Sequence, residues 1–315
     1  MAVNVDTVYK TVLLILNKEQ RGYIPPYEFN KIATQVQLEI FEKYFEDLNQ
    51  QLRVPENDSE YANRVKNVDE KIDIFKRICD ATYSTDYFYL PNNDITAATL
   101  TVGGTGYSTS IVPQATTGGS GSGCTVNTVA TAGAVTSFTI ANRGSGYQIG
   151  DILTISGGGG NATITVTTIC DPVHRLGTVM YREKEVQRIQ RNEYLLVNKS
   201  SLTTPTTINP VYILEGNVSI SALHDKIFVY PNSIQSGVTV SYVTKPTDPD
   251  WGYTVGSNGE YLHSPGASTN FQLHGSEQTN IILNILIYAG VIIRDPQIVQ
   301  NAAQMVQQDE VNEKS

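Results

Sequence analysis

The chain has 315 residues, of which 40% are hydrophobic and 17% are charged, and its formal net charge is −9. This length exceeds what one core of ~100–200 residues needs, and the composition excludes a disordered polyelectrolyte and a membrane protein. The 31 acidic residues against 22 basic ones disfavour a grip on nucleic-acid phosphates, which needs a basic surface. We therefore expect two domains, or one domain with an insertion, whose main ligand is not nucleic acid.

The N-terminal region carries no cationic segment, and its longest apolar run, from Val12 to Leu16, is too short for a secretory leader or a membrane span. We expect the protein to stay in a cytoplasm until it is assembled, without a membrane partner. The three cysteines, Cys79, Cys124 and Cys170, leave one unpaired and follow no metal-ligand or redox spacing, so we interpret them as small buried or indifferent residues.

Helical spacing dominates the first 80 residues. A first helix is predicted from Val8 to Leu16, a second opens at Pro25 and Pro26, and a third covers residues 69–80. The second helix carries an apolar stripe wide enough to face two partners. We take this stripe as a candidate contact with another chain, and burial inside its own domain is the alternative. Its residues are Phe29, Ile32, Val36, Ile40, Tyr44 and Leu48.

Residues 95–170 form a separate module. Arg143 and Asp151 are its only charged residues, and it contains 15 of the chain's 25 glycines. The segments 98–129 and 138–169 repeat each other at an offset of 40 residues, because Gly104-Thr-Gly-Tyr107 matches Gly144-Ser-Gly-Tyr147. Each copy is predicted to contain strands around a Gly-x-Gly-Tyr turn, and the two copies are expected to pack face to face.

The glycine-rich turns allow a phosphate cradle or a calcium site as alternatives. A phosphate loop leads into a helix, whereas β pattern lies on both sides here, and calcium needs ~6–8 oxygen ligands while Asp151 is a lone carboxylate. We therefore interpret the motif as a structural turn in both copies. The residues concerned are Gly106, Tyr107, Gly146, Tyr147 and Asp151.

Strand patterns flank the module and continue after it. The aromatic run Tyr87 to Leu90 is expected to pair with Val179 to Tyr181, which would bring the two ends of the insertion together. A short helix is predicted over residues 183–191. Strands follow at 211–214, 226–230 and 238–243, the last two as an antiparallel pair, and two helices, starting near Ser276 and at Asp295, end the chain.

These patterns predict an α+β protein. Helical N- and C-terminal segments flank a small antiparallel β host domain, into which an all-β, Gly/Thr-rich repeat module is inserted. The expected parts are residues 1–94 (helices and first strand of the host), 95–170 (inserted module), 171–275 (β part of the host) and 276–315 (C-terminal helices).

Familiar catalytic and cofactor signatures are absent from the sequence, and its four histidines, His174, His224, His263 and His274, lie in separate predicted loops or strand ends. We therefore expect no catalytic, cofactor-binding or metal-binding residues. A carboxylate pair for glycoside hydrolysis remains an alternative. Its candidates are Asp225, Asp248, Asp250 and Glu260, with Trp251 and Tyr253 to stack on a sugar; a proline turn and a core tryptophan are the plainer interpretation.

The block Gly22-Tyr-Ile-Pro-Pro-Tyr-Glu-Phe-Asn30, continued by Ile40 to Phe45, resembles the start of neck proteins of crAss-like and related short-tailed bacteriophages. The stretch from Leu273 to Pro296 resembles a later part of the same proteins. The Gly-Ser-Gly-Tyr repeat is similar to β-modules that are inserted in phage structural and fibre proteins. Together these matches cover about half of the chain.

The resemblance implies a non-enzymatic head-to-tail connector, located in the virion neck and assembled in the host cytoplasm. It implies a homo-oligomeric ring, a dodecamer, whose partners are the portal protein, other neck or tail proteins and tail fibres. DNA is expected only as passing cargo, which an acidic channel wall would suit. Two alternatives remain: a fibre-anchoring or glycan-binding adhesin, and a virion glycan hydrolase.

Overall fold

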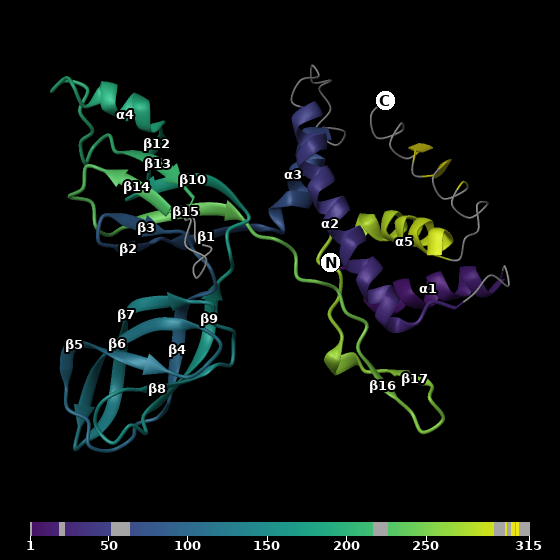
Figure 1. Ribbon diagram of the computed structural model, residues 1–315, viewed down its shortest axis with the longest axis horizontal. Coiled ribbons are helices and arrows are strands. Elements are labelled where there is room, and N and C mark those ends of the chain that lie inside the picture. The colour runs from purple at the N-terminus through teal and green to yellow at the C-terminus, as the bar shows by residue number, and fades with distance from the viewer. Residues whose placement is uncertain are drawn as a thin grey trace. The chain divides into compact units, whose positions relative to one another are not determined.

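The computed structural model describes residues 2–18, 23–51, 64–216 and 226–292, together with residues 300, 304, 305, 307 and 308. The chain divides into two compact units, which Figure 1 shows with their elements labelled. Unit 1 comprises Met1–Phe75 and Pro246–Ser315, and unit 2 comprises Lys76–Lys245. The division into four parts stays a prediction.

Unit 1 is a helical body with one small hairpin. Its elements are α1 (Val5–Lys18), α2 (Pro26–Gln51), α3 (Arg64–Asp73), β16 (Tyr253–Val255), β17 (Tyr261–His263), the 3₁₀ turns η1 (Pro265–Ala267) and η2 (Gly275–Glu277), and α5 (Gln278–Ile292). α5 packs against α1 and α2, and α2 also packs against α3. The rings of Phe41 and Phe75 meet edge to face at 4.9 Å, and Lys71 of α3 pairs with the buried Glu277 at 2.7 Å.

Two sheets of unit 2 share one core. The first has the order β1-β15-β10-β11 and the second β12-β13-β14-β3-β2. Buried residues of both sheets, among them Phe88, Ile227 and Val240, form one apolar cluster. The strands are β1 (Lys76–Asp80), β2 (Thr82–Ser84), β3 (Tyr87–Tyr89), β10 (Arg175–Tyr181), β11 (Lys184–Glu185), β12 (Gln187–Arg188), β13 (Val211–Glu215), β14 (Lys226–Tyr230) and β15 (Val238–Val243), and the short helix α4 (Arg191–Val197) follows β12.

The glycine-rich residues of unit 2 form a third sheet of six strands, with the order β4-β9-β8-β5-β6-β7. The 40-residue repeat maps the first three of these strands in the chain onto the last three, so strands of the two copies are intermixed within one sheet. The prediction that the copies pack face to face was therefore wrong. The strands are β4 (Asp94–Val102), β5 (Ser110–Thr117), β6 (Ser122–Thr131), β7 (Ala134–Ser145), β8 (Ile152–Ile155) and β9 (Thr163–Cys170).

The expected fold class needs correction, because the protein is mostly β. Strands account for 37% of the structure and helices for 29%, with several sheets including one that is nearly a barrel. The predicted α+β arrangement, with helical ends around a small β host domain, was wrong. Two segments with helix-compatible patterns are responsible in part: residues 76–80 form β1, and residues 184–188 form β11 and β12.

Two predicted strand pairings were also wrong. β10 pairs with β15 and β11 rather than with β3, and β14 pairs with β13 and β3 rather than with β15. Alternating apolar residues identify a strand and its buried face, but they do not identify its neighbour. The predicted C-terminal helix that starts at Asp295 lies largely outside the described residues.

A disulfide joins Cys79 of β1 to Cys170 at the end of β9, with their Cα atoms 6.2 Å apart. Cys124 is free and buried. All three cysteines are buried, as expected, but Cys79 and Cys170 are not indifferent residues, because they form this bond. Cys79 and Cys170 are 91 residues apart in the chain and lie on strands of two different sheets, so their spacing in the sequence does not reveal the bond.

Candidate functional site

The two Gly-x-Gly-Tyr turns connect the copies of the repeat to each other. The buried Tyr107 hydroxyl donates to the Ile155 carbonyl oxygen at 2.8 Å and accepts from the Ala162 N–H at 3.1 Å. The equally buried Tyr147 hydroxyl accepts from the Cys124 N–H at 3.2 Å. Each tyrosine thus satisfies backbone groups of the other copy, which gives both residues a structural role.

The glycines of these turns are required by the backbone and by the tyrosine rings. Gly104 and Gly144 have φ of 65° and 60°, and a Cβ on either would lie 2.8 Å from the Cε2 atom of its own turn's tyrosine. Gly106 and Gly146 have φ of 75° and 78°. Residues with a Cβ atom rarely adopt such φ values, so the backbone of the turn itself explains why glycine recurs in the motif.

Asp151 acts as a clamp between two turns of the same sheet. Its carboxylate accepts from the Ser120 hydroxyl at 2.6 Å and from the backbone N–H groups of Gln148 and Ser120 at 2.9 and 3.0 Å. The Gln148 bond and the two Ser120 bonds hold the pKa of the Asp151 carboxyl below its ordinary value. Within the described ranges, no group of three or more His, Cys, Asp or Glu side chains could hold a metal ion.

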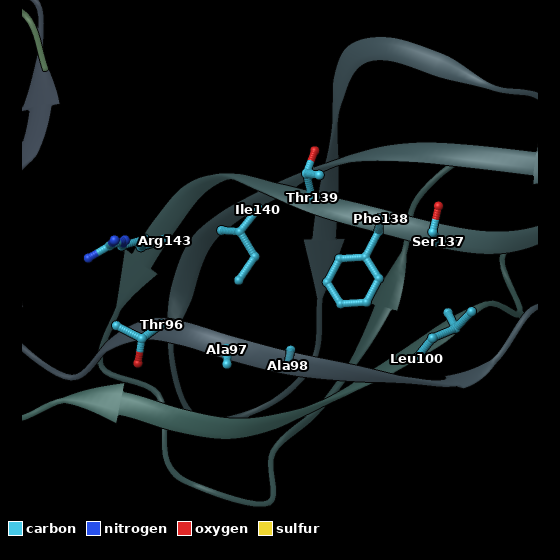
Figure 2. Close-up of a pocket in the computed structure, with 9 residues that line it drawn as sticks. All are labelled: Thr96, Ala97, Ala98, Leu100, Ser137, Phe138, Thr139, Ile140 and Arg143. Atoms are coloured by element: carbon cyan, nitrogen blue, oxygen red, sulfur yellow. The ribbon is translucent and has the colours of Figure 1, made fainter. Parts of the chain in front are cut away.

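A groove lies at the seam where the outer edges of the six-stranded sheet, β4 and β7, approach each other (Figure 2). Backbone hydrogen bonds close the seam at both ends: Val135 N donates to Gly103 O at 2.7 Å, and Tyr147 N donates to Asn93 O at 3.1 Å. The groove between these ends has a volume of about 520 Å³. Its lining comprises Thr96, Ala97, Ala98, Leu100, Ser137, Phe138, Thr139, Ile140 and Arg143.

The groove combines apolar side chains with hydroxyl groups. Arg143, at one end, is held by Asp80 through a 2.8 Å ion pair, so its charge is already matched within the chain. Apolar surface with a few hydroxyl groups suits an apolar side chain or one face of a sugar ring. The open seam is thus a surface that sequence reasoning did not find, because strand pairing determines which edges meet.

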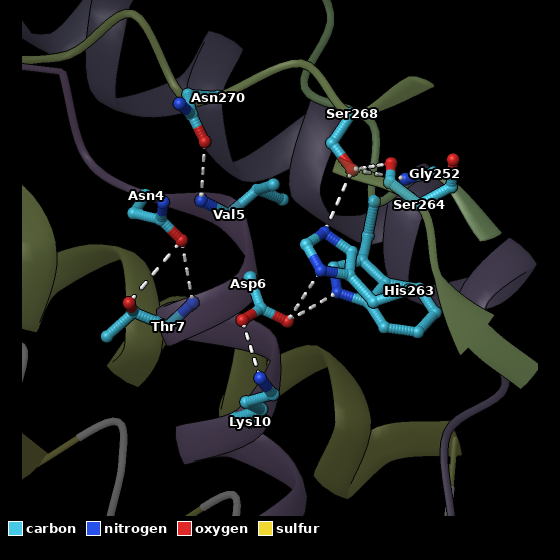
Figure 3. A network of polar contacts seen from close by, with 11 residues as sticks. Asn4, Val5, Asp6, Thr7, Lys10, Gly252, His263, Ser264, Ser268 and Asn270 are labelled. Carbon is cyan, nitrogen blue, oxygen red and sulfur yellow. Dashed lines mark hydrogen bonds and ion pairs between the residues drawn. The ribbon is translucent and has the colours of Figure 1, made fainter. Parts of the chain in front are cut away.

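A polar network in unit 1 gathers residues from both ends of the chain (Figure 3). Asp6, in the first turn of α1, accepts from the Trp251 indole N–H at 3.0 Å and pairs with Lys10 at 2.7 Å. Nδ1 of His263 lies 3.6 Å from the same carboxylate. Although burial raises the pKa of the Asp6 carboxyl, the hydrogen bonds from Lys10 and Trp251 outweigh it and hold the pKa below its ordinary value.

The network also contains a Ser–His–Asp arrangement, since Nε2 of His263 lies 3.0 Å from the Ser268 hydroxyl. That hydroxyl donates its single hydrogen to the Ser264 carbonyl oxygen at 2.8 Å and accepts from the Gly252 N–H at 3.0 Å. His263 must therefore donate to Ser268, whereas an activated serine needs a histidine that accepts its proton. In this arrangement the network fixes the root of the β16–β17 hairpin against α1.

The candidate stripe of α2 lies mostly inside its own unit. Five of its six side chains are buried, and Leu48 is half-buried. The alternative stated for the stripe was burial inside its own domain. The five buried side chains are those of Phe29, Ile32, Val36, Ile40 and Tyr44. A contact of α2 with another chain stays a prediction.

Two of the carboxylates considered for sugar hydrolysis accept hydrogen bonds from nearby residues of unit 1. Asp250 accepts a side-chain hydrogen bond from Asn30, and Glu260 accepts from the Asn258 N–H at 3.0 Å in the hairpin turn. Asp225 lies outside the described residues. Trp251 is buried and packs against Tyr9 with ring centroids 4.5 Å apart, so the interpretation of a core tryptophan is confirmed.

Comparisons with known proteins find no match to this chain, neither among protein-family models nor among curated proteins. Among the described residues, no helix is both long and apolar enough to cross a membrane.

Proposed function

We propose that the chain is a virion structural protein that forms a ring in the neck of a bacteriophage, joins the portal to the tail and extends the DNA channel. One observation supports this most directly. The two stretches that resemble phage neck proteins are far apart in the chain, yet their described residues, 23–30 with 40–45 and 273–292, belong to the same compact unit.

Helix α2 carries residues of the first stretch and α5 carries residues of the second, and the two helices pack against each other. The buried Gln37 of α2 accepts from the Gln272 N–H at 2.9 Å and donates to the Thr247 carbonyl oxygen at 2.7 Å. Tyr288 of α5 donates a hydrogen bond to Glu39 of α2. The resemblance therefore describes one folded body rather than two unrelated segments.

A ring arises when each copy repeats the same heterologous contact until the circle closes. Unit 1 offers exposed aromatic and aliphatic side chains for such a contact at Tyr23, Tyr27 and Leu14. Tyrosine suits an interface because it joins a large apolar area to a polar tip. In this proposal unit 1 contacts the portal and neighbouring copies, other neck or tail proteins bind the assembled ring, and the Gly/Thr-rich sheet faces outward, where tail fibres could attach.

Electron cryo-microscopy of the assembly that contains this chain tests the proposal. We expect twelve copies around an axial channel beside the portal. Three or six copies at a peripheral appendage would contradict the ring and move the protein to the adhesin class.

A charge substitution adds a control. Tyr27→Lys places a cation on the exposed aromatic surface of unit 1 and should reduce ring formation at equal protein concentration. Ile111→Lys, at a position that is 88% exposed on the third sheet, should leave ring formation unchanged. Equal assembly of the two variants would contradict a contact through Tyr27.

A further inference from the structure

Strands β16 and β17 form a two-stranded sheet that has no third strand in the described part of the chain. Their ladder begins where Ser264 N donates to Gly252 O at 2.8 Å and ends where Gly256 N donates to Glu260 O at 2.8 Å. An isolated two-stranded hairpin is only marginally stable in water. The hairpin is nevertheless held at its root by the Asp6 network, so it is an ordered element that lacks a lateral partner.

The register of the ladder identifies the backbone groups that face outward. Hydrogen-bonded and non-hydrogen-bonded pairs alternate in an antiparallel ladder, and both end pairs described above are hydrogen-bonded. The pairs Tyr253–His263 and Val255–Tyr261 lie one step inward from these ends, so they are the non-hydrogen-bonded ones. Their N–H and C=O groups point away from the hairpin, toward its two outer edges.

These two edges are short, but they lack the charged residues and the proline that often protect an exposed strand. β16 and β17 contain no Lys, Arg, Asp, Glu or Pro. Val255 is 62% exposed, Leu262 51% and Tyr261 42%. Three outer strands of the other unit, β1, β11 and β12, carry charged residues, whereas the outer strand β2 carries none. An unprotected edge with exposed apolar side chains is the kind of surface that pairs with another strand.

We propose that the hairpins of neighbouring copies pair edge to edge, with β16 of one copy beside β17 of the next, so that the ring carries a closed β-barrel. This inference rests on the ring proposed above and adds the contact that would close it. Within a hairpin β16 and β17 run in opposite directions, so between copies that all point the same way the new pair is antiparallel too. A second copy of the chain is the partner that leaves no edge open, because the contact repeats around the circle.

Hydrogen exchange resolved to single residues tests this pairing in the full-length chain. The amides of Tyr253, Val255, Tyr261 and His263 should exchange at least about tenfold more slowly in the assembled ring than in the dilute monomer. The amides of Thr254 and Leu262 point into the ladder and should be protected equally in both. Native mass spectrometry of the same samples gives the number of copies.

A proline substitution supplies a matched pair of variants. Val255→Pro removes one outward N–H and leaves the hairpin's own ladder intact, because proline is tolerated where an edge N–H faces outward. We expect it to abolish the added protection of Tyr261 in the ring, whereas Val255→Thr, which keeps the N–H, should retain that protection. Unchanged exchange at Thr254 and Leu262 verifies that the hairpin of Val255→Pro is still folded.

The outcomes separate the two proposals. A ring in which the outward amides exchange as fast as in the monomer overturns the barrel and leaves the ring in place. Equal protection of Tyr261 in Val255→Pro and Val255→Thr also overturns the barrel. A chain that stays monomeric at every concentration and beside the purified portal overturns both proposals.

Discussion

At the scale of single residues, Asp94 is the buried carboxylate with a predictable effect on stability. It lies at the start of β4, accepts from the Asn92 N–H at 3.1 Å and from the Thr82 hydroxyl at 3.4 Å, and is 2% exposed. Burial raises the pKa of its carboxyl from 3.8 to about 6, despite these hydrogen bonds. The folded state thus binds the proton more tightly than the unfolded chain, and this contribution to the free energy of unfolding decreases as the pH rises from about 4 to 6.

Asp94→Asn should remove the decrease in the free energy of unfolding that ionisation of Asp94 causes as the pH rises. Above pH 6 the variant is expected to be more stable than the wild type by about 3 kcal/mol, since the pKa of Asp94 is raised from 3.8 to about 6 and each pKa unit corresponds to about 1.4 kcal/mol, while below pH 4 the two should be similar. Urea unfolding across pH 4–8 measures the difference. A variant that is less stable than the wild type at pH 7 would contradict the assignment.

Asp151→Asn is the matched control, with the opposite sign. Its carboxyl has a lowered pKa, so its charge stabilises the folded state above the unfolded pKa, and this contribution is lost as the pH falls. The variant is therefore expected to be less stable than the wild type at pH 7. The two substitutions should shift the midpoint of unfolding in opposite directions in the same buffer.

Some single-residue features could be predicted from the sequence and others could not. The turn glycines and tyrosines could be predicted, because their motif repeats and turn chemistry is local. The contacts of Asp6 with Trp251 and His263 could not, because nearly the whole chain separates them and each residue alone has an ordinary structural explanation.

At the scale of elements, the sequence identified most strands but not their partners. Tyr87–Tyr89, Val211–Glu215, Lys226–Tyr230 and Val238–Val243 are strands as expected, yet their assignment to two different sheets was missed. Alternation is a property of one strand, whereas pairing depends on loops and on packing over long distances in the chain. The apolar stripe of α2 has the same ambiguity, because burial and an interface demand the same residues.

The disulfide is the element-scale feature with the clearest test. It closes a loop of 91 residues between β1 and β9, and constraining so long a loop in the unfolded chain is worth about 2–5 kcal/mol. Reduction should therefore lower the free energy of unfolding by about that amount. Urea unfolding with and without reductant measures it. The Cys79→Ser/Cys170→Ser variant should show no response to reductant, and Cys124→Ala should respond as the wild type does.

A count of thiols provides an independent check. Alkylation of the unfolded, unreduced chain should label Cys124 alone, and reduction should expose three thiols. Three labelled cysteines before reduction would contradict the bond. Such bonds are rare in a reducing cytoplasm, so under the virion proposal we expect this one to form after release from the host cell.

At the scale of the whole molecule, the division into two units explains which part of the sequence was easiest to interpret. The resemblance to neck proteins falls on unit 1, where helical periodicity is strong, and the repeat falls on unit 2, where glycine marks each turn. The strand content was underestimated because short charged strands such as Lys184–Glu185 carry no apolar alternation.

The net charge of −9 leads to the last prediction, which concerns the assembled ring and DNA. A conduit must let DNA pass without binding it, and binding to phosphates requires cations that release counterions as they contact the backbone. We expect the purified ring to show no complex with duplex DNA in a filter-binding assay between 50 and 200 mM salt, and we expect the residues that face the channel to be acidic on balance. A complex that weakens steeply with salt, or a channel lined with basic residues, would contradict the conduit and favour a DNA-gripping role.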